Sequence, residues 1–192
     1  MKELANVLSS KLFFTSDTHF GHFNICRLCN RPFDSRSAMD QGLIERWNAV
    51  VPEDGVVVHC GDFMLPHKND LKEYMHYMSK LNGCIHLCRG NHDRISLSDV
   101  EVNEKLGLVQ DILKIQVDGV SIIACHFPLL AYPSDYHVFG HIHTLKDGTC
   151  HGLDASVPTM LRASQFDVGV DQNDYAPISW NKLHSLLNEK TL

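Results

Sequence analysis

The sequence of 192 residues lacks several features that would define a function class. It has no run of the roughly 20 apolar residues that a membrane-spanning helix needs. Its N-terminus has no basic segment followed by a long apolar run, so neither a membrane partner nor a secretory signal is expected. Basic residues are few, with 17 Lys and Arg against 23 Asp and Glu and a net charge of −6. This charge gives no general electrostatic reason to expect duplex nucleic acid as a partner.

The chain also lacks internal repeats, low-complexity segments and linkers, which predicts a single domain over residues 1–192. Its 44% hydrophobic and 21% charged residues are typical of a globular protein that builds its own core. Seven scattered cysteines, an odd number, indicate reduced thiols and a cytoplasmic protein. Cys26 and Cys29 form a C-x-x-C without a matching second pair, because three residues separate Cys84 from Cys88. Buried thiols are therefore favoured over a zinc ribbon.

Histidine is abundant, with 13 residues, and many of them follow apolar runs. The segment 15–22, Thr-Ser-Asp-Thr-His-Phe-Gly-His, comes directly after the apolar run 11–14, which predicts a buried strand. Asp17 and His19 are two residues apart, so in an extended chain their side chains leave the same face. A carboxylate and an imidazole placed in this way can bind a divalent cation. Taken alone, the fragment is better explained as a capped turn with a surface histidine.

The order of predicted elements indicates an α/β fold. Strands at 56–60 and 84–88 alternate with amphipathic helices, one capped by Asp34 or Ser35 and running to Val51, the other at about 68–80, as in a mostly parallel sheet. The second half differs, because Asp118-Gly119 between two apolar runs predicts a β-hairpin over 112–124. Further short strands are expected near 138–139, 150–157 and 166–170, and a final helix from about residue 179.

Polar side chains follow five of the predicted strands. Each has a structural explanation when taken alone, such as a helix cap, a turn residue, a packed loop histidine or a surface pair. Sheet topology can bring such strand ends to one rim, and the whole inventory suits two divalent metals. The five groups are Asp17 with His19, Asp62, Asn91 with His92, His126, and His141 with His143.

This ordered set resembles the calcineurin-like metallophosphoesterase family. The match runs through Asp17-x-His19, Gly61-Asp62, Gly90-Asn91-His92-Asp93, His126 and Gly140-His141-x-His143. The residues at 17–22 and at 168–171 are similar to those of a compact bacterial and phage branch of this family. The resemblance implies an α/β, α+β-like sandwich, with mixed β-sheets flanked by helices in the four-layer metallophosphoesterase fold.

The resemblance also implies a role for each matching residue. One metal would be bound by Asp17, His19 and His143, the other by Asn91, His126 and His141, and Asp62 would bridge the two. His92 would stay off the metals and act on the phosphoryl group or the leaving oxygen.

The implied function is that of a dinuclear metal-dependent phosphoesterase, in which a metal-bridging hydroxide attacks the phosphate ester. Oxygen and imidazole ligands without thiolate suit manganese, iron, zinc or nickel, and manganese is favoured here. The short segments between motifs leave little material for a cap domain. The site is therefore expected to be open, which is compatible with nucleotides, cyclic nucleotides or nucleic-acid ends. Phosphodiesters are favoured over monoesters as substrates. The sequence does not give the oligomeric state.

Two alternatives stay open beside the enzyme. One is a metal-stabilised, non-catalytic module that binds a phosphorylated partner. The other is a nuclease subunit that needs a partner chain, because this chain has no basic stripe of its own.

Several residues beside the motifs have two interpretations each. Asp93 either orients His92 or caps the next turn. His22 either contacts substrate or binds a metal through a water, or it only fixes its own loop. Three arginines are candidate phosphate contacts, although solvated surface arginines are more common: Arg27, Arg31 and Arg89.

Overall fold

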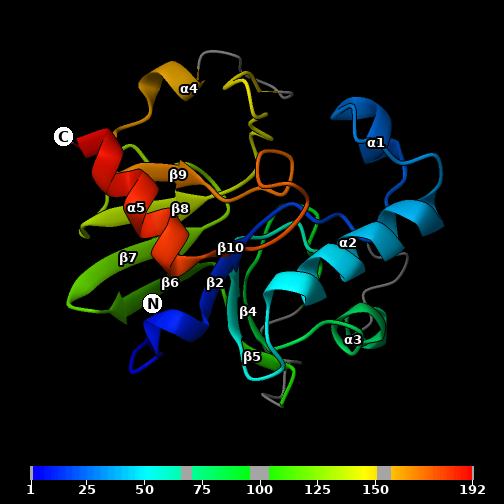
Figure 1. The fold of residues 1–192 in the computed structure, drawn as a ribbon, viewed down its shortest axis with the longest axis horizontal. Helices are drawn as coiled ribbons and strands as arrows, with labels where there is room; N and C mark the ends of the chain where they lie inside the picture. Colours follow the sequence, from blue (N-terminus) through cyan, green and yellow to red (C-terminus); the bar gives the residue numbers. More distant parts are fainter. Residues whose placement is uncertain (1, 66–70, 96–103, 151–156, 192) are drawn as a thin grey trace.

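The computed structural model of the protein describes residues 2–65, 71–95, 104–150 and 157–191. In this part of the chain, two five-stranded sheets pack against each other and helices flank them (Figure 1). Both sheets contain parallel and antiparallel neighbours. The predicted α/β fold with mixed sheets and flanking helices is therefore confirmed.

The first sheet has the strand order β10-β2-β3-β4-β5. Its central strands are the predicted ones, and all neighbours are parallel except the β10–β2 pair. Strands β5 and β10 were not predicted from the sequence. The strands are β2 (Leu12–Thr15), β3 (Val56–His59), β4 (Cys84–Cys88), β5 (Leu106–Gln110) and β10 (Ile178–Ser179).

The connections between these strands carry short and medium-length helices. They are α1 (Asn24–Leu28), α2 (Arg36–Val50) and α3 (Leu71–Met78). Ser35 is the N-cap of α2, and its side chain accepts a hydrogen bond of 3.1 Å from the backbone N–H of Ala38. Of the two capping residues considered, Ser35 is therefore the one used.

The second sheet has the strand order β1-β6-β7-β8-β9. The predicted hairpin is present as β6 and β7, which pair antiparallel around Asp118 and Gly119. The predicted strand over 150–157 lies mostly outside the described residues, and Val157–Met160 form helix α4. The strands are β1 (Lys2–Leu4), β6 (Ile112–Val117), β7 (Val120–Cys125), β8 (Tyr136–Phe139) and β9 (Gln165–Asp167); a 3-10 turn, η1 (Ser9–Lys11), precedes β2.

Strand β9 is shorter than the predicted strand over 166–170, because the chain changes partner after Asp167. Val168 still donates to the carbonyl of Phe139, but Val170 donates to that of Ser16, just after β2 in the other sheet. Gly169 forms an isolated bridge with Ser16. This crossing joins the two sheets at the end where the polar motifs lie.

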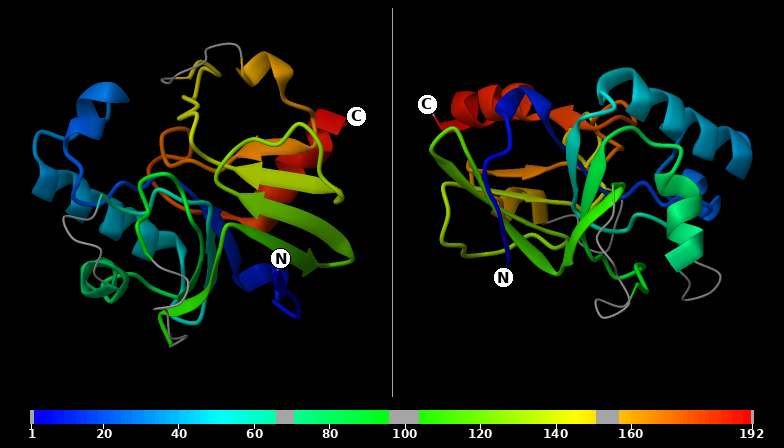
Figure 2. Two further views of the ribbon diagram at one scale, coloured as in Figure 1. Left: turned by 180° about the vertical axis from the view of Figure 1, so that it is seen from behind. Right: turned by 90° about the horizontal axis from the view of Figure 1, so that it is seen from below.

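Two hydrophobic cores follow from the alternation of side chains along the strands. Phe13 points into a core shared with Trp47 of α2 and Tyr74 of α3. Phe14 points into the core between the two sheets, where Trp180 also packs. Helix α5 (Trp180–Thr191) contributes to this inter-sheet core, well apart from α2 and α3 in the right-hand view of Figure 2.

Two sequence expectations concern general properties. Among the described residues, none of the helices has the length and apolar character required to cross a bilayer. All seven cysteines lie in the described ranges, and all are free thiols.

Candidate metal centre

The predicted ligands come together where strands of both sheets end. Asp17 and His19 follow β2, Asp62 follows β3 and Asn91 follows β4, while the other three follow β7 and β8. Backbone hydrogen bonds tie the loops to each other, since Asp17 N donates to Gly61 O at 2.9 Å and His19 N to Asp62 O at 3.0 Å. The structure therefore places side chains from distant parts of the sequence around one centre.

The backbone is unusual at this centre. Of the ten non-glycine residues with positive φ in the described part of the chain, five are predicted ligands. This left-handed region is costly for side chains other than glycine, and such strain gathers at functional sites. The five are Asp17 (57°), His19 (52°), Asp62 (53°), His141 (73°) and His143 (49°).

Two motif glycines allow the close approach of these loops. A Cβ atom on Gly90 would lie 2.2 Å from Asp62 Oδ1, and one on Gly140 would lie 1.9 Å from Ser16 Oγ. Neither position has room for a side chain, which gives a physical reason for glycine in the Gly-Asn-His-Asp and Gly-His-x-His segments.

The first donor set consists of Asp17, His19 and His143. Asp17 Oδ1 lies 3.9 Å from His19 Nε2 and 3.9 Å from His143 Nε2. Asp17 Oδ1 and both ring nitrogens of His19 are buried without a hydrogen-bond partner. Buried polar atoms are nearly always paired, so the Asp17 oxygen and one of the two His19 nitrogens are suited to bind a cation. One carboxylate oxygen and two imidazole nitrogens at this spacing fit a divalent cation.

The second donor set consists of Asn91, His126 and His141, with Asp62 beside it. His126 Nδ1 donates to the carbonyl of Cys60 at 2.9 Å, so in a neutral ring the Nε2 atom carries the lone pair. That lone pair faces the Asn91 Oδ1 acceptor at 2.9 Å and His141 Nδ1 at 3.2 Å. Acceptors that converge in this way fit a cation placed among them.

Asp62 lies between the two sets. Its Oδ2 atom is 3.6 Å from His19 Nε2 and 3.5 Å from His126 Nε2, while its Oδ1 atom accepts from the backbone N–H of His92 at 2.8 Å. Among the described residues, Asp17, His19 and His143 form one close cluster, and Asp62 forms another with His126 and His141.

Burial and neighbouring charges shift the pKa values of three of the predicted ligands. Burial, helped by the negative charge of Asp17, raises the pKa of the Asp62 carboxyl to about 7. Burial and the nearby His143 hold the pKa of His19 well below its usual value. Burial opposes protonation of His143 as well, but Asp17 and the hydrogen bond to Asp171 raise its pKa to about 11.

These shifts predict that cation binding depends on pH. The unfolded Asp62 carboxyl loses its proton near 3.8 and the folded one near 7, so the metal-free fold loses stability from this group as pH rises between those values. A cation must also displace protons from Asp62 and His143. The increase in melting temperature caused by Mn²⁺, relative to EDTA, is expected to grow from pH 5 to pH 8. An increase that is constant or larger at pH 5 would contradict this account.

A buried ion pair outside the predicted set supports the first donor set. Arg31 is only 5% exposed, and its Nε and Nη2 atoms donate to the two Asp171 oxygens at 2.8 and 3.0 Å. Asp171 Oδ2 in turn accepts from His143 Nδ1 at 2.8 Å. Arg31 also donates to the carbonyls of Asp17 and Thr18.

Neither interpretation of Arg31, phosphate contact or solvated surface residue, holds, because its side chain is buried and its donors bind groups inside the protein. Asp171 belongs to the segment 168–171, whose similarity to the compact bacterial and phage branch could have drawn attention to it. Nothing in the sequence linked Asp171 to Arg31. Cys29, His143 and Asp171 also cluster closely. The Arg31 charge on both Asp171 oxygens disfavours a separate cation there.

The carboxylate of Asp93 accepts hydrogen bonds from backbone N–H groups of the loops that carry the ligands. It accepts from Asp62 N at 2.8 Å, Gly90 N at 2.9 Å and Phe63 N at 3.1 Å. Orienting His92 and capping the next turn were the two interpretations given for Asp93, and these contacts add a third role, in which the carboxylate fixes the loops that carry the ligands.

The other candidate residues lie around the rim. The ring of His22 is 5.5 Å from that of His19 and 5.9 Å from that of His92, which places it beside the centre. Arg89 pairs with Asp111, and its Nε and Nη2 atoms both donate to Oδ1, at 2.9 and 2.7 Å. Arg89 therefore lies near Asn91 but is already engaged.

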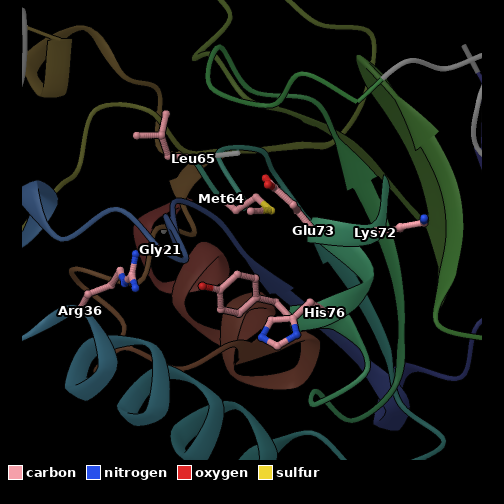
Figure 3. A pocket seen from close by; sticks show the side chains of 8 residues that line it. Gly21, Arg36, Met64, Leu65, Lys72, Glu73 and His76 are labelled. Carbon is pink, nitrogen blue, oxygen red and sulfur yellow. The ribbon is translucent and has the colours of Figure 1, made fainter. Parts of the chain in front are cut away.

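Two cavities adjoin these rim residues. One, of about 480 Å³, is lined by Asn91 and His126 together with Arg89 and Phe127. The other, of about 310 Å³, begins at Gly21, next to His22, and Figure 3 shows its lining side chains from α2, α3 and the segments after β2 and β3. The larger cavity thus gives space beside Asn91 and His126 for part of a ligand.

Comparison with known proteins identifies the family. A protein of Methanocaldococcus jannaschii described as uncharacterized is 30% identical over 182 residues, which is 93% of this chain and 92% of that protein. A solved structure of a protein of unknown function from Aquifex aeolicus has a TM-score of 0.66 at 25% identity, covering 91% of this chain and 98% of its own. An archaeal phosphodiesterase aligns with a TM-score of 0.46 at 18% identity, covering 84% of this chain and 83% of its own. The family model of the calcineurin-like phosphoesterases matches residues 10–125, and the chain belongs to that family.

Proposed function

We propose that this chain is a single-domain, dinuclear metal-dependent phosphoesterase that prefers phosphodiesters to monoesters. The observation that carries the proposal is the position of Asp62, whose Oδ2 atom lies within 3.6 Å of an imidazole nitrogen from each donor set. A carboxylate shared in this way is suited to hold two cations side by side.

Each donor set would hold one divalent ion, and manganese is the favoured metal. Bound ions of this kind supply positive charge to a phosphoryl group and lower the pKa of coordinated water. The protein contributes rigid placement: His126 is fixed by Cys60, His143 by Asp171, and Asp62 by the His92 backbone. The ligand sets are Asp17, His19 and His143 for one ion and Asn91, His126 and His141 for the other, with Asp62 shared.

His92 is the residue proposed to act on the substrate itself. Its side chain is 38% exposed, and its Nε2 atom is 4.0 Å from Asp62 Oδ2, so it faces both the centre and solvent. From this position it can donate a proton to the leaving oxygen as the phosphorus–oxygen bond breaks. His22, whose ring lies beside that of His92, is proposed to contact the same substrate.

The preference for diesters rests on space and charge. The cavity of about 480 Å³ beside Asn91 and His126 leaves room for a second ester substituent. Arg89, engaged with Asp111, offers only a partly neutralised charge to a doubly ionised monoester.

The first experiment measures metal content and hydrolysis together. Protein loaded with Mn²⁺ is expected to hold close to two ions per chain and to hydrolyse an aryl phosphodiester faster than the matching monoester. Two ions without hydrolysis of either ester would favour the non-catalytic phosphate-binding module, and activity that appears only with a partner chain would favour the nuclease subunit. No ion uptake would overturn the proposal.

His92→Ala separates catalysis from metal binding. This variant is expected to keep both ions and to lose roughly 10²–10⁴-fold in kcat, the usual contribution of a general acid. His184→Ala is a matched control that should keep the wild-type rate, because His184 lies on α5, stacks on Trp180 and lines neither cavity. A His92→Ala protein that remains equally fast on several esters would remove the residue from the mechanism.

A further inference from the structure

Phe127 is a large apolar side chain that the fold leaves open to solvent next to the candidate metal ligands. It directly follows His126, which is buried, yet 48% of Phe127 is exposed. Its ring centroid lies 4.8 Å from that of His126 and 4.7 Å from that of His141, both edge to face. An exposed aromatic ring in contact with two ligands of one donor set needs a reason beyond packing.

The loop that carries Phe127 is held firmly on both sides. His126 is bound to the carbonyl of Cys60 at 2.9 Å. Leu129 donates its backbone N–H to His137 Nε2 at 3.1 Å, and its carbonyl accepts from Gln165 Nε2 at 2.9 Å. Since its neighbours are anchored, the ring is presented in a fixed place, and little conformational entropy is lost when a ligand packs against it.

The ring forms one wall of the cavity of about 480 Å³ that Asn91 and His126 also line. Leu129 and Ile112 add apolar surface to the same cavity. A phosphoryl group bound at the metal centre would have one of its substituents next to these apolar side chains, in a lining that also includes Arg89, Asp93 and Asp111.

The charged groups that line the cavity indicate which kind of substituent it can accommodate. Arg89 is the cation in the lining, but two of its N–H groups bind Asp111 and a third donates to the carbonyl of Ile95. Because this cation is paired, the described residues that line the cavity offer no free positive group for a second phosphate. A flat, uncharged, aromatic substituent fits these walls better.

We propose that Phe127 is a specificity residue that stacks on the nucleobase of a nucleoside phosphate ester. The inference rests on the proposed function, since the phosphate must bind at the metal centre for the base to reach the ring. It assigns the nucleoside class of esters to this site and Phe127 as the residue that selects it.

Two phosphates that differ only in the base test this inference. Binding of thymidine 5′-monophosphate and of 2-deoxyribose 5-phosphate to the manganese-loaded protein is measured by titration calorimetry. A base stacked on an aromatic side chain contributes enough for about 5- to 150-fold in affinity, so thymidine 5′-monophosphate is expected to bind tighter by a factor in this range. Phe127→Leu, which keeps an apolar side chain but removes the ring, should bring the ratio close to one.

Phe127→Trp should preserve the ratio, because an indole also stacks. Phe23→Leu is the matched control, since Phe23 is a comparably exposed phenylalanine that does not line this cavity, and it should leave the ratio unchanged. Equal affinity for the two phosphates in the wild type, or an unchanged ratio in Phe127→Leu, would overturn the inference alone. If neither phosphate binds to the metal-loaded protein, the proposed function falls and the inference falls with it.

Discussion

Asp62→Asn is expected to lose both metal ions while the metal-free fold stays at least as stable as the wild type. The amide can keep the acceptor for the His92 backbone N–H, but it replaces Oδ2 by an NH₂ group that faces the nitrogens of His19 and His126. Changes in outer-shell partners already cost roughly 10–100-fold in metal affinity, so loss of a shared ligand should cost at least that at each set.

The same substitution that weakens metal binding is not expected to lower the stability of the metal-free protein. Burial raises the pKa of Asp62 to about 7, which means that the fold disfavours its charge when no cation is present. Above pH 7 the neutral amide avoids the cost of burying a negative charge, so Asp62→Asn in EDTA should melt at the same temperature as the wild type or at a higher one. Metal analysis and thermal unfolding at pH 8 measure the two effects separately.

Asp118→Asn is the matched control for this variant. Asp118 is another Asp with φ near +50°, but it lies in the β6–β7 turn, away from the donor sets. It should keep two ions and the wild-type melting temperature. Full metal content with a wild-type rate in Asp62→Asn would disprove the shared-ligand assignment.

Asp171→Asn is expected to lose one ion of the two and to destabilise the metal-free protein. The carboxylate accepts from His143 Nδ1, which leaves Nε2 of that ring free to bind a cation. An amide nitrogen turned toward His143 favours the other tautomer, with the proton on Nε2, and the first donor set then loses a ligand. The second donor set, built on His126 and His141, should keep its ion.

The same change leaves Arg31 buried with a neutral partner. Removing one member of a buried ion pair commonly costs about 3–5 kcal/mol, which urea unfolding in EDTA would detect. Asp54→Asn is the control, because Asp54 pairs with Lys11 on the surface and its loss should leave metal content and stability unchanged. Two tightly held ions in Asp171→Asn would show that this residue does not position His143.

The first half of the fold was predictable because hydrophobic periodicity and strand-end polar residues agree there. The hairpin around Asp118 was predictable from its turn residues. Strands β5 and β10 were missed because their pairing is decided by tertiary contacts: β10, for example, has only the two residues Ile178 and Ser179. Strand β9 ends early because the chain switches to the other sheet at Gly169. No local sequence pattern predicts this switch.

The candidate ligands were predictable because each stands at the end of an apolar run in a recognisable motif. Their surroundings were not. The link between Arg31 and Asp171 joins positions far apart in the chain, and the role of Asp93 as an acceptor for three backbone N–H groups depends on how the loops pack. Contacts of this kind carry no periodic signal in a single sequence.

The meeting of the two sheets at this centre has a consequence for how the molecule is held together. Each proposed donor set takes ligands from loops of both sheets: Asp17 and His19 join His143, and Asn91 joins His126 and His141. A bound ion is then a cross-link between the two sheets. Neither sheet alone carries a complete set, so ion capture must wait until the sheets have docked, and each captured ion then resists their separation.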